Sequence, residues 1–429
     1  MQDFLLAQES DRPVQSIGPE YKPRTLVETG VREGVLEDIA LKTLYASGPF
    51  SVFELSKQTR LSFEVAQDLF TRMRGKLLCE VVGMVSNVPK IAITSHGRSR
   101  ALELLSQSQY AGAAPVSLAS YVEQVRKQSV RNVTVGPADV EKAFAHLVMD
   151  HKTLTQFGTA LNSGAAVFLY GPPGVGKTAA AESLSRVLAQ DEVWIPHAVE
   201  VDGQIITVFD PVIHRKSKEA VPDNHDERWL RCHRPTVLVG GELTVEMLDL
   251  QFNPATNYYV GPMQMKANNG VLIIDDLGRQ RIRPEELLNR WVVPLDRRIE
   301  FLTMAGGRKI EIPFEMLVVF ASNKNPTEIM DSAFLRRIQT KIHIGTVSDE
   351  QFSQIFKRVA EEHGLKCEPA VVKELIGIIR DVLKQDLLAC QPRDLVNQVR
   401  WAARYQGTSP QLDRTALSAA VEAYFLQKN

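Results

Sequence analysis

The chain has 429 residues, 44% of them hydrophobic, and a formal net charge of -1 at pH 7. This length favours two or three domains with full cores, and the nearly balanced charge provides no general attraction to nucleic acid or anionic membranes. No run of 18 apolar residues predicts a membrane span, and the first residues lack the pattern of a secretory signal. The four cysteines have no metal-ligand or disulfide spacing, so a reducing cytoplasm is the expected location.

Residues 1–30 are polar and contain three prolines, which predicts an extended arm. Residues 31–106 predict a small α+β domain. In its helical segments apolar residues recur at helical intervals, and serines that can cap a helix begin two of them. The predicted helices span residues 34–47, 51–59, 62–74 and 95–105, and the predicted strands span residues 79–85 and 90–94. Three helices followed by a two-stranded hairpin resemble a winged helix-turn-helix domain.

A winged helix can contact either DNA or protein, and its charge helps to separate the two. Residues 31–106 contain ten Lys/Arg and eight Asp/Glu. The candidate recognition helix holds Glu64 and Asp68 beside Arg72 and Arg74. Because the reading of DNA usually needs a clearly basic face, contact with a protein client or adaptor is favoured. DNA binding is the alternative.

Residues 107–135 predict a helical linker, and residues 136–345 alternate strands and helices as in an α/β nucleotide-binding core. Within this core the run GPPGVGKT, residues 171–178, fits a phosphate loop. An apolar, strand-like run precedes it and a segment of strong helix propensity follows it, which is the context that such a loop requires. The residues predicted to contact nucleotide are Gly171, Pro172, Pro173, Gly174, Val175, Gly176, Lys177, Thr178 and Ala179.

The chemistry of phosphate binding explains these residue types. Glycines let backbone N–H groups converge on phosphate oxygens, and the start of the following helix adds a partial positive charge. Lys177 is expected to reach the β- and γ-phosphates of ATP, and Thr178 is expected to bind Mg²⁺. Downstream, residues 270–276 (GVLIIDD) predict an apolar strand that ends in two carboxylates. Asp275 is predicted to hold Mg²⁺, and Asp276 is predicted to polarise the attacking water.

The separation between Lys177 and Asp275 exceeds what a bare core needs. Because a structureless loop of such length is improbable, an insertion is predicted at about residues 195–265. Within it, residues 210–234 are highly charged and are predicted to be exposed. From residue 346 to residue 429 the pattern is almost wholly helical, which predicts an all-α C-terminal domain.

Together these motifs resemble those of the AAA+ ATPases over roughly residues 136–429. The resemblance implies that Asn323, which ends the run LVVFASN, contacts the γ-phosphate or the water. It implies that Arg336 or Arg337, in AFLRRI, enters the site of a neighbouring subunit. It also implies that Arg393, in QPRDL, links a C-terminal lid to bound phosphate. The expected fold is α/β, with an AAA+ phosphate-loop core that has a parallel sheet, an all-α lid and an N-terminal winged-helix-like α+β domain.

The stretch before the acidic pair (KANNGVLIIDD) and a second candidate hairpin at residues 299–312 resemble the helix-2-insert branch of the AAA+ proteins. The segments at residues 313–314 and 322–326 most resemble those of MoxR-like chaperone ATPases. In that branch two hairpins face the centre of a ring. Aromatic side chains of the first hairpin either grip a polypeptide there or pack within their own subunit. These side chains belong to Phe252, Tyr258 and Tyr259.

The resemblance implies a ring-forming, Mg²⁺-dependent ATPase, expected to be a hexamer of this chain, that remodels or unfolds protein substrates. The N-terminal domain is expected to select the client. The family usually has Asp-Glu where this chain has Asp275-Asp276, and the shorter carboxylate lies farther from the attacking water. A slowly hydrolysing nucleotide switch is therefore one alternative function, and an ATP-controlled DNA-binding regulator is another.

Overall fold

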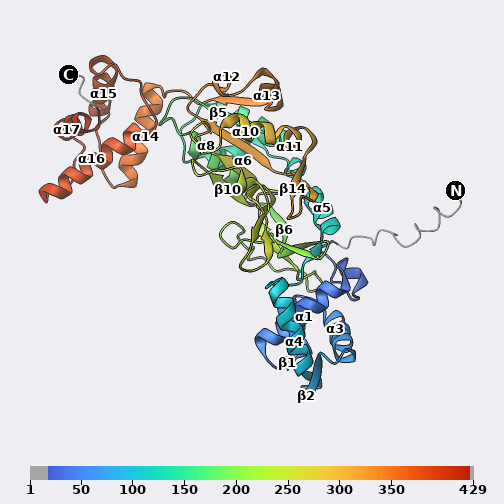
Figure 1. Cartoon of the computed structure of the whole chain (residues 1–429). Coiled ribbons are helices and arrows are strands. Elements are labelled where there is room, and N and C mark those ends of the chain that lie inside the picture. The colour runs from blue at the N-terminus through green and yellow to red at the C-terminus, as the bar shows by residue number, and fades with distance from the viewer. Residues whose placement is uncertain (1–17, 426–429) are drawn as a thin grey trace, which may run out of the picture.

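The structure, a computed structural model, describes residues 18–425. Figure 1 shows an elongated molecule with three parts in chain order. An N-terminal unit lies at one end, an α/β core with an attached β region lies in the middle, and a helical domain lies at the other end. Between residues 18 and 425 no helix combines the length and the apolar character that crossing a membrane requires. Residues 1–17 of the predicted arm fall outside the described residues.

The core contains a parallel sheet of five strands, which confirms the predicted α/β class. Neighbouring strands follow the order β10-β13-β16-β5-β17. Of the three central strands, β13 is followed by the acidic pair, β16 by Asn323 and β5 by the phosphate loop. Residues in these three strands are almost all buried, as expected for a parallel sheet covered on both faces. The strands are β5 (Val167–Tyr170), β10 (Thr236–Val239), β13 (Val271–Ile274), β16 (Leu317–Ser322) and β17 (Thr340–His343).

Alternate residues of each strand point to opposite faces of the sheet, so the sheet packs into two cores. On one face Phe168 and Phe320 pack with Trp291 and the helices after the acidic pair. On the other face Val167 and Val319 pack with the helices around the phosphate loop. This double cover holds the carboxyl ends of the strands in place. The helices of the core are α6 (Pro137–Phe144), α7 (His151–Ser163), α8 (Lys177–Leu188), α9 (Met263–Lys266), α10 (Pro284–Arg290), α11 (Val292–Arg297), α12 (Pro326–Ile329) and α13 (Ser332–Arg337).

The N-terminal unit packs helices around an antiparallel sheet with the order β1-β3-β2. Ser51 begins α2 with a capping box, because its hydroxyl accepts from the Glu54 N–H and the Glu54 carboxylate accepts from the Ser51 N–H. The helices and the hairpin lie over the residues for which the sequence predicted them, and β1 is an additional short strand. The elements are α1 (Glu33–Ser47), β1 (Phe50–Ser51), α2 (Val52–Thr59), α3 (Phe63–Gly75), β2 (Cys79–Val85), β3 (Val88–Ile93) and α4 (Ser95–Gln107).

A β region lies between the core and the N-terminal unit, and it differs from the predicted insertion in two ways. The predicted interval of 195–265 contains β10, which pairs with β13 in the core sheet. The predicted linker of 107–135 contains a strand, β4, which pairs with β7 of the β region. A short apolar strand has the same pattern in either sheet, so only its pairing partner distinguishes them. The elements are β4 (Val116–Ser117), α5 (Leu118–Lys127), β6 (Glu192–Pro196), β7 (Ala198–Val201), β8 (Gln204–Thr207), β9 (Trp229–His233), β11 (Gln251–Asn253), β12 (Tyr258–Val260), β14 (Ile299–Thr303) and β15 (Lys309–Pro313).

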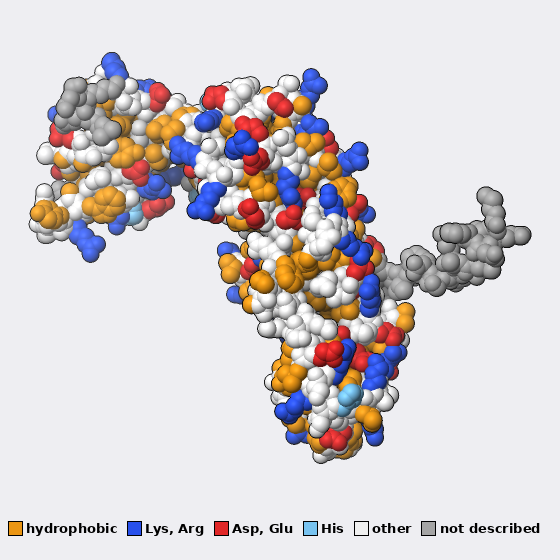
Figure 2. Space-filling model, viewed as in Figure 1, with side chains coloured by type: hydrophobic (Ala, Val, Ile, Leu, Met, Phe, Trp, Pro, Cys, Tyr) orange, Lys and Arg blue, Asp and Glu red, His pale blue; other side chains and the backbone are white. Residues whose placement is uncertain are grey.

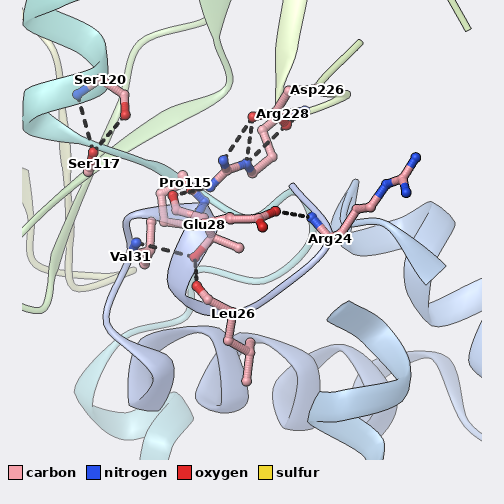
Figure 3. Close-up of polar contacts among 10 residues, drawn as sticks. Arg24, Leu26, Glu28, Val31, Pro115, Ser117, Ser120, Asp226 and Arg228 are labelled. Atoms are coloured by element: carbon pink, nitrogen blue, oxygen red, sulfur yellow. Dashed lines mark hydrogen bonds and ion pairs between the residues drawn. The ribbon is translucent and has the colours of Figure 1, made fainter. Parts of the chain in front are cut away.

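Arg228, which forms a buried ion pair within the β region, links this region to the N-terminal unit (Figure 3). The side chains of Arg228 and Asp226 are 2% and 1% exposed, and their closest nitrogen and oxygen lie 2.8 Å apart. Nη1 of Arg228 also donates to the carbonyl oxygens of Thr29 at 2.9 Å and of Pro115 at 3.0 Å. The prediction that the whole of residues 210–234 is exposed is therefore wrong. Burial is possible here because the two charges neutralise each other and because the spare guanidinium N–H groups have acceptors.

The N-terminal unit also contacts the hairpin formed by β11 and β12. Asn257, in the turn of this hairpin, donates through Nδ2 to a carbonyl oxygen near the end of α4 at 2.9 Å. The ring of Tyr258 meets that of Tyr110 edge to face, with centroids 5.5 Å apart. Tyr259 is only 3% exposed, whereas Phe252 is 44% exposed. For the two tyrosines, packing within their own subunit is thus the arrangement observed.

The C-terminal domain is all-α, as predicted. Its core contains Phe352 and Phe356 from the first helix, together with Leu395 and Leu417 from two later helices. Ser348 begins the first helix with a capping box. The helices are α14 (Asp349–Glu362), α15 (Pro369–Gly377), α16 (Gln391–Gln406) and α17 (Arg414–Tyr424), with a π-helical turn at Ile378–Val382.

Candidate nucleotide-binding site

The phosphate loop connects β5 to α8 at the carboxyl edge of the parallel sheet. Gly171 has a φ of 149°, and a Cβ there would lie 1.9 Å from the carbonyl oxygen of Ile344. Only glycine fits this position, because both the backbone angle and the close contact exclude a side chain. Val175 is buried in the core and anchors the loop, while Pro173 is exposed at its crest.

Lys177 is the first residue of α8, and only 7% of it is exposed. Its Nζ donates to the carbonyl oxygens of Gly171 at 3.0 Å and Pro172 at 2.8 Å, and to Oδ1 of Asn323 at 2.6 Å. Burial lowers the pKa of Lys177, while the two carboxylates at the end of β13 act in the opposite direction. The ammonium group therefore lies between the loop and the end of β16.

Thr178 and Asp275 meet next to this lysine. The Thr178 hydroxyl donates to Oδ2 of Asp275 at 2.6 Å. A hydroxyl and one carboxylate are oxygen ligands of the kind that Mg²⁺ prefers when phosphate oxygens and waters complete its shell. Over the described part of the chain, residues 18–425, no group of three or more His, Cys, Asp or Glu side chains could hold a metal by itself. The residues present thus fit a cation that is bound together with nucleotide.

Asp276 and Asn323 are also brought together. Nδ2 of Asn323 donates to Oδ1 of Asp276 at 3.1 Å, while Oδ1 of Asn323 accepts from Lys177. Asp276 has a φ of 51°, in the left-handed region that is uncommon for residues other than glycine. The Asn323 amide therefore sets the position of the Asp276 carboxylate relative to the lysine ammonium.

Arg336 and Arg337, the two candidates for an arginine finger that enters the site of a neighbouring subunit, lie at the end of α13. Their surroundings differ. Arg337 donates through Nε to Oδ2 of Asp296 at 2.8 Å. Arg336 is exposed and makes no hydrogen bond or ion pair with any residue in the described range. Neither arginine contacts the phosphate loop of its own chain. Of the two, Arg336 is the one whose guanidinium is available to another molecule.

The C-terminal domain reaches the phosphate loop through the segment just before α16. The backbone N–H of Cys390 donates to the carbonyl oxygen of Gly174 at 3.0 Å. Gly174 has a φ of 82°, and a Cβ there would lie 2.7 Å from Sγ of Cys390. Arg393, in the first turn of α16, is 66% exposed and pairs with Asp394. The structure therefore places Arg393 near the loop but without a contact to it.

Two residues at the site were not predicted from the sequence. Cys390 touches the phosphate loop, and Gln280 donates through Nε2 to the Asp275 carbonyl oxygen at 2.6 Å. No local pattern marks either residue, because both contacts depend on how distant segments pack. Ala179, also predicted to contact nucleotide, lies in the first turn of α8, and its carbonyl oxygen accepts from the Ser183 hydroxyl.

Comparison with known proteins gives one family match to part of the chain and structural similarities at low sequence identity. A family profile described as a domain of unknown function, DUF8689, matches residues 348–423, which form the helical C-terminal domain. No characterised protein matches the chain significantly by sequence. Among solved structures, NtrX from Brucella abortus in complex with ADP is similar at 14% identity and a TM-score of 0.41, over 66% of this chain and 57% of NtrX. The Thermotoga maritima RuvB Holliday junction branch migration motor is similar at 15% identity and a TM-score of 0.39, over 64% of this chain and 70% of RuvB.

The chain has an α/β fold with a phosphate loop at the edge of a parallel sheet. This class is defined by features of the chain itself, since the similarity to any one solved structure is low. The features are the parallel sheet, the phosphate loop between β5 and α8, and the polar residues that end the two neighbouring strands. An all-α domain in contact with the phosphate loop completes the arrangement.

Proposed function

We propose that this protein binds Mg·ATP at the phosphate loop and hydrolyses it. The observation that carries the proposal is a series of polar contacts from Lys177 to Asn323 at 2.6 Å and from Asn323 to Asp276 at 3.1 Å. These three groups come from three separate segments. They meet beside the loop, where a bound triphosphate would place its γ-phosphate.

Each side chain has a role that its contacts support. Lys177 would donate to the β- and γ-phosphate oxygens, and Asp276 would accept a proton from a water that Asn323 orients. Thr178 and Asp275 would hold Mg²⁺, which when bound neutralises charge on the phosphate oxygens.

Assembly into a ring is the second part of the proposal. Arg336 would act on the nucleotide of a neighbouring copy, where an arginine supplied by another subunit can be worth about 10³-fold or more in rate. Its exposed position without a polar partner in residues 18–425 supports this role, because a guanidinium that must reach a neighbour cannot be committed to its own chain. Arg393 would sense bound phosphate from the lid.

The remodelling of protein clients, as in the MoxR-like chaperone ATPases, is the third part, with the cytoplasm as its location. The N-terminal unit, interpreted as a winged-helix-like domain, would hold the client. Its fixed attachment through Arg228 supports this role, since force from the core reaches a client only through a rigid connection.

Three variants of the full chain test the ATPase proposal. Lys177→Ala should abolish binding of a fluorescent ATP analogue, because the loop loses its only ammonium group. Asp276→Asn should bind the analogue normally but release phosphate about 10²- to 10⁴-fold more slowly, because the proton acceptor is lost. Lys152→Ala removes an exposed lysine on α7 and should match the unmodified protein.

The outcomes of this experiment are distinct. If Lys177→Ala binds the nucleotide as tightly as the unmodified protein, the loop is not the binding site. If the unmodified protein binds ATP but never releases phosphate at any protein concentration, the protein is a nucleotide switch and the hydrolysis proposal fails.

A further inference from the structure

Strand β2 lies at the edge of the N-terminal sheet, at the end of the molecule most distant from the phosphate loop (Figure 1). The sheet order β1-β3-β2 pairs this strand with β3 on one side only. Its other side presents backbone N–H and C=O groups that no strand of residues 18–425 pairs with. An edge of this kind is a ready template for another extended chain.

The side chains of β2 are unusually apolar for such an edge. Val81, Val82, Met84 and Val85 are 39%, 52%, 62% and 49% exposed, respectively. Glu80 is the only charged residue of the strand. Figure 2 shows hydrophobic side chains at this end of the molecule.

Proteins usually protect an exposed edge with lysine, proline or a strong bulge. Strand β2 contains neither lysine nor proline, and its single register shift lies between Val81 and Gly83. The strand beyond Gly83 pairs regularly with β3. The edge therefore has little protection against pairing with other chains. A protein with no partner for such an edge would tend to aggregate.

We propose that β2 is a docking site for an extended apolar segment of a partner polypeptide, which adds to the sheet as a further strand. Backbone hydrogen bonds along the edge would supply affinity, and the valine and methionine side chains would select apolar residues at alternate positions. This inference extends the proposed remodelling function, because β2 would be the place where a client is held. Docking itself needs neither ATP nor a ring.

Charge and area argue against two other occupants. Nucleic acid needs a basic surface, whereas the only charge on β2 is negative. A second copy of this chain is disfavoured because the four partly exposed side chains offer only roughly a few hundred Å² of apolar surface. A stable interface needs about 800 Å² from each partner, whereas a short peptide can bind usefully with less.

The test uses the full chain without nucleotide, so that its outcome does not depend on ATPase activity. Peptides of twelve residues are selected from a random library on the immobilised protein, and their Kd values are measured by fluorescence anisotropy. The double variant V82K/M84K places two lysines on the exposed face of β2. The matched control V212K/V382K adds the same charge at positions that are 88% and 72% exposed elsewhere.

We expect selected peptides to be rich in β-branched and aromatic residues and to bind V82K/M84K at least tenfold more weakly than the control. Because the changed side chains are exposed, the melting temperature of V82K/M84K should stay close to that of the unmodified protein. Bound peptide should also slow amide hydrogen exchange in Cys79–Val85, which mere adhesion to an apolar patch would not do.

Three results would overturn the proposal. In the first, no peptide is selected, or the selected peptides bind V82K/M84K and the control equally. In the second, sedimentation shows a dimer that V82K/M84K abolishes, which makes a second copy the occupant. In the third, duplex DNA binds the unmodified protein and displaces the selected peptides from it.

Discussion

Replacing Arg228 with methionine is expected to loosen the junction between the N-terminal unit and the β region while the rest of the protein stays folded. Methionine fills much of the same volume but leaves Asp226, whose side chain is 1% exposed, as a buried charge without its cation. The variant loses three hydrogen bonds to Asp226, between 2.8 and 3.1 Å long, and two to the carbonyl oxygens of Thr29 and Pro115. Removing one partner of a buried ion pair costs about 3–5 kcal/mol.

Local opening is the quantity to measure, because a chain with several parts need not unfold in one step. A loss of about 4 kcal/mol increases the opening equilibrium about 10³-fold. Hydrogen exchange followed by mass spectrometry should therefore show faster exchange in residues 18–32 and 110–117. Exchange in the parallel sheet should be unchanged, since the Arg228→Met substitution touches none of its strands.

Two controls separate the ion pair from other effects. The double variant D226N/R228M removes both charges and should recover about 2 kcal/mol relative to R228M, because no uncompensated charge is left. Arg32→Met breaks an ion pair to Asp202 at the same junction, but Arg32 is 61% exposed, so the loss should be below about 1 kcal/mol. If R228M exchanges like the unmodified protein, the reasoning that this pair holds the unit in place is refuted.

Two further predictions concern buried charge and assembly. Burial raises the pKa of Glu300 to about 7, with Arg290 acting in the opposite direction, so the folded protein holds a proton that the unfolded chain loses near pH 4.5. The free energy of unfolding should therefore fall by about 3 kcal/mol as the pH rises from 4.5 to 7. Glu300→Gln should remove this pH dependence, as measured by urea titrations at several pH values. An unchanged pH dependence in the variant would show that Glu300 does not titrate in this range. Arg336→Ala should reduce ATP turnover at least about 10³-fold without changing the melting temperature. Arg337→Ala, which loses the contact to Asp296, should leave turnover within a few-fold, and the reverse order of effects would make Arg337 the finger.

Features encoded by neighbouring residues were predictable from the sequence. The capping box of Ser51 and Glu54 lies within four consecutive residues, and it begins α2 as the pattern predicts. The parallel sheet was likewise predictable from apolar runs that alternate with helical patterns, because a strand covered on both faces must be apolar throughout. In such cases the physical requirement is local, so the residues that satisfy it are adjacent in the chain.

Features that depend on pairing between distant segments were not predictable. The run TVLV of β10 reads as a strand, but its membership of the core sheet depends on β13, more than thirty residues further along the chain. Charge in residues 210–234 indicated exposure, and Arg228 is buried instead, because its partners include Thr29 and Pro115. The sequence of residues 210–234 alone does not identify those partners, because they lie far away in the chain.

The sequence by itself determined the local chemistry of the candidate site: a loop shaped for phosphate, a hydroxyl beside its lysine, and two carboxylates at the end of a buried strand. Only the tertiary structure decided that Lys177 meets Asn323, 146 residues later, and that Cys390 rests on Gly174. The reason is physical. Backbone conformation and residue propensity act over a few residues, whereas strand order and helix packing, which decide which ends of the strands meet, are properties of the whole folded chain.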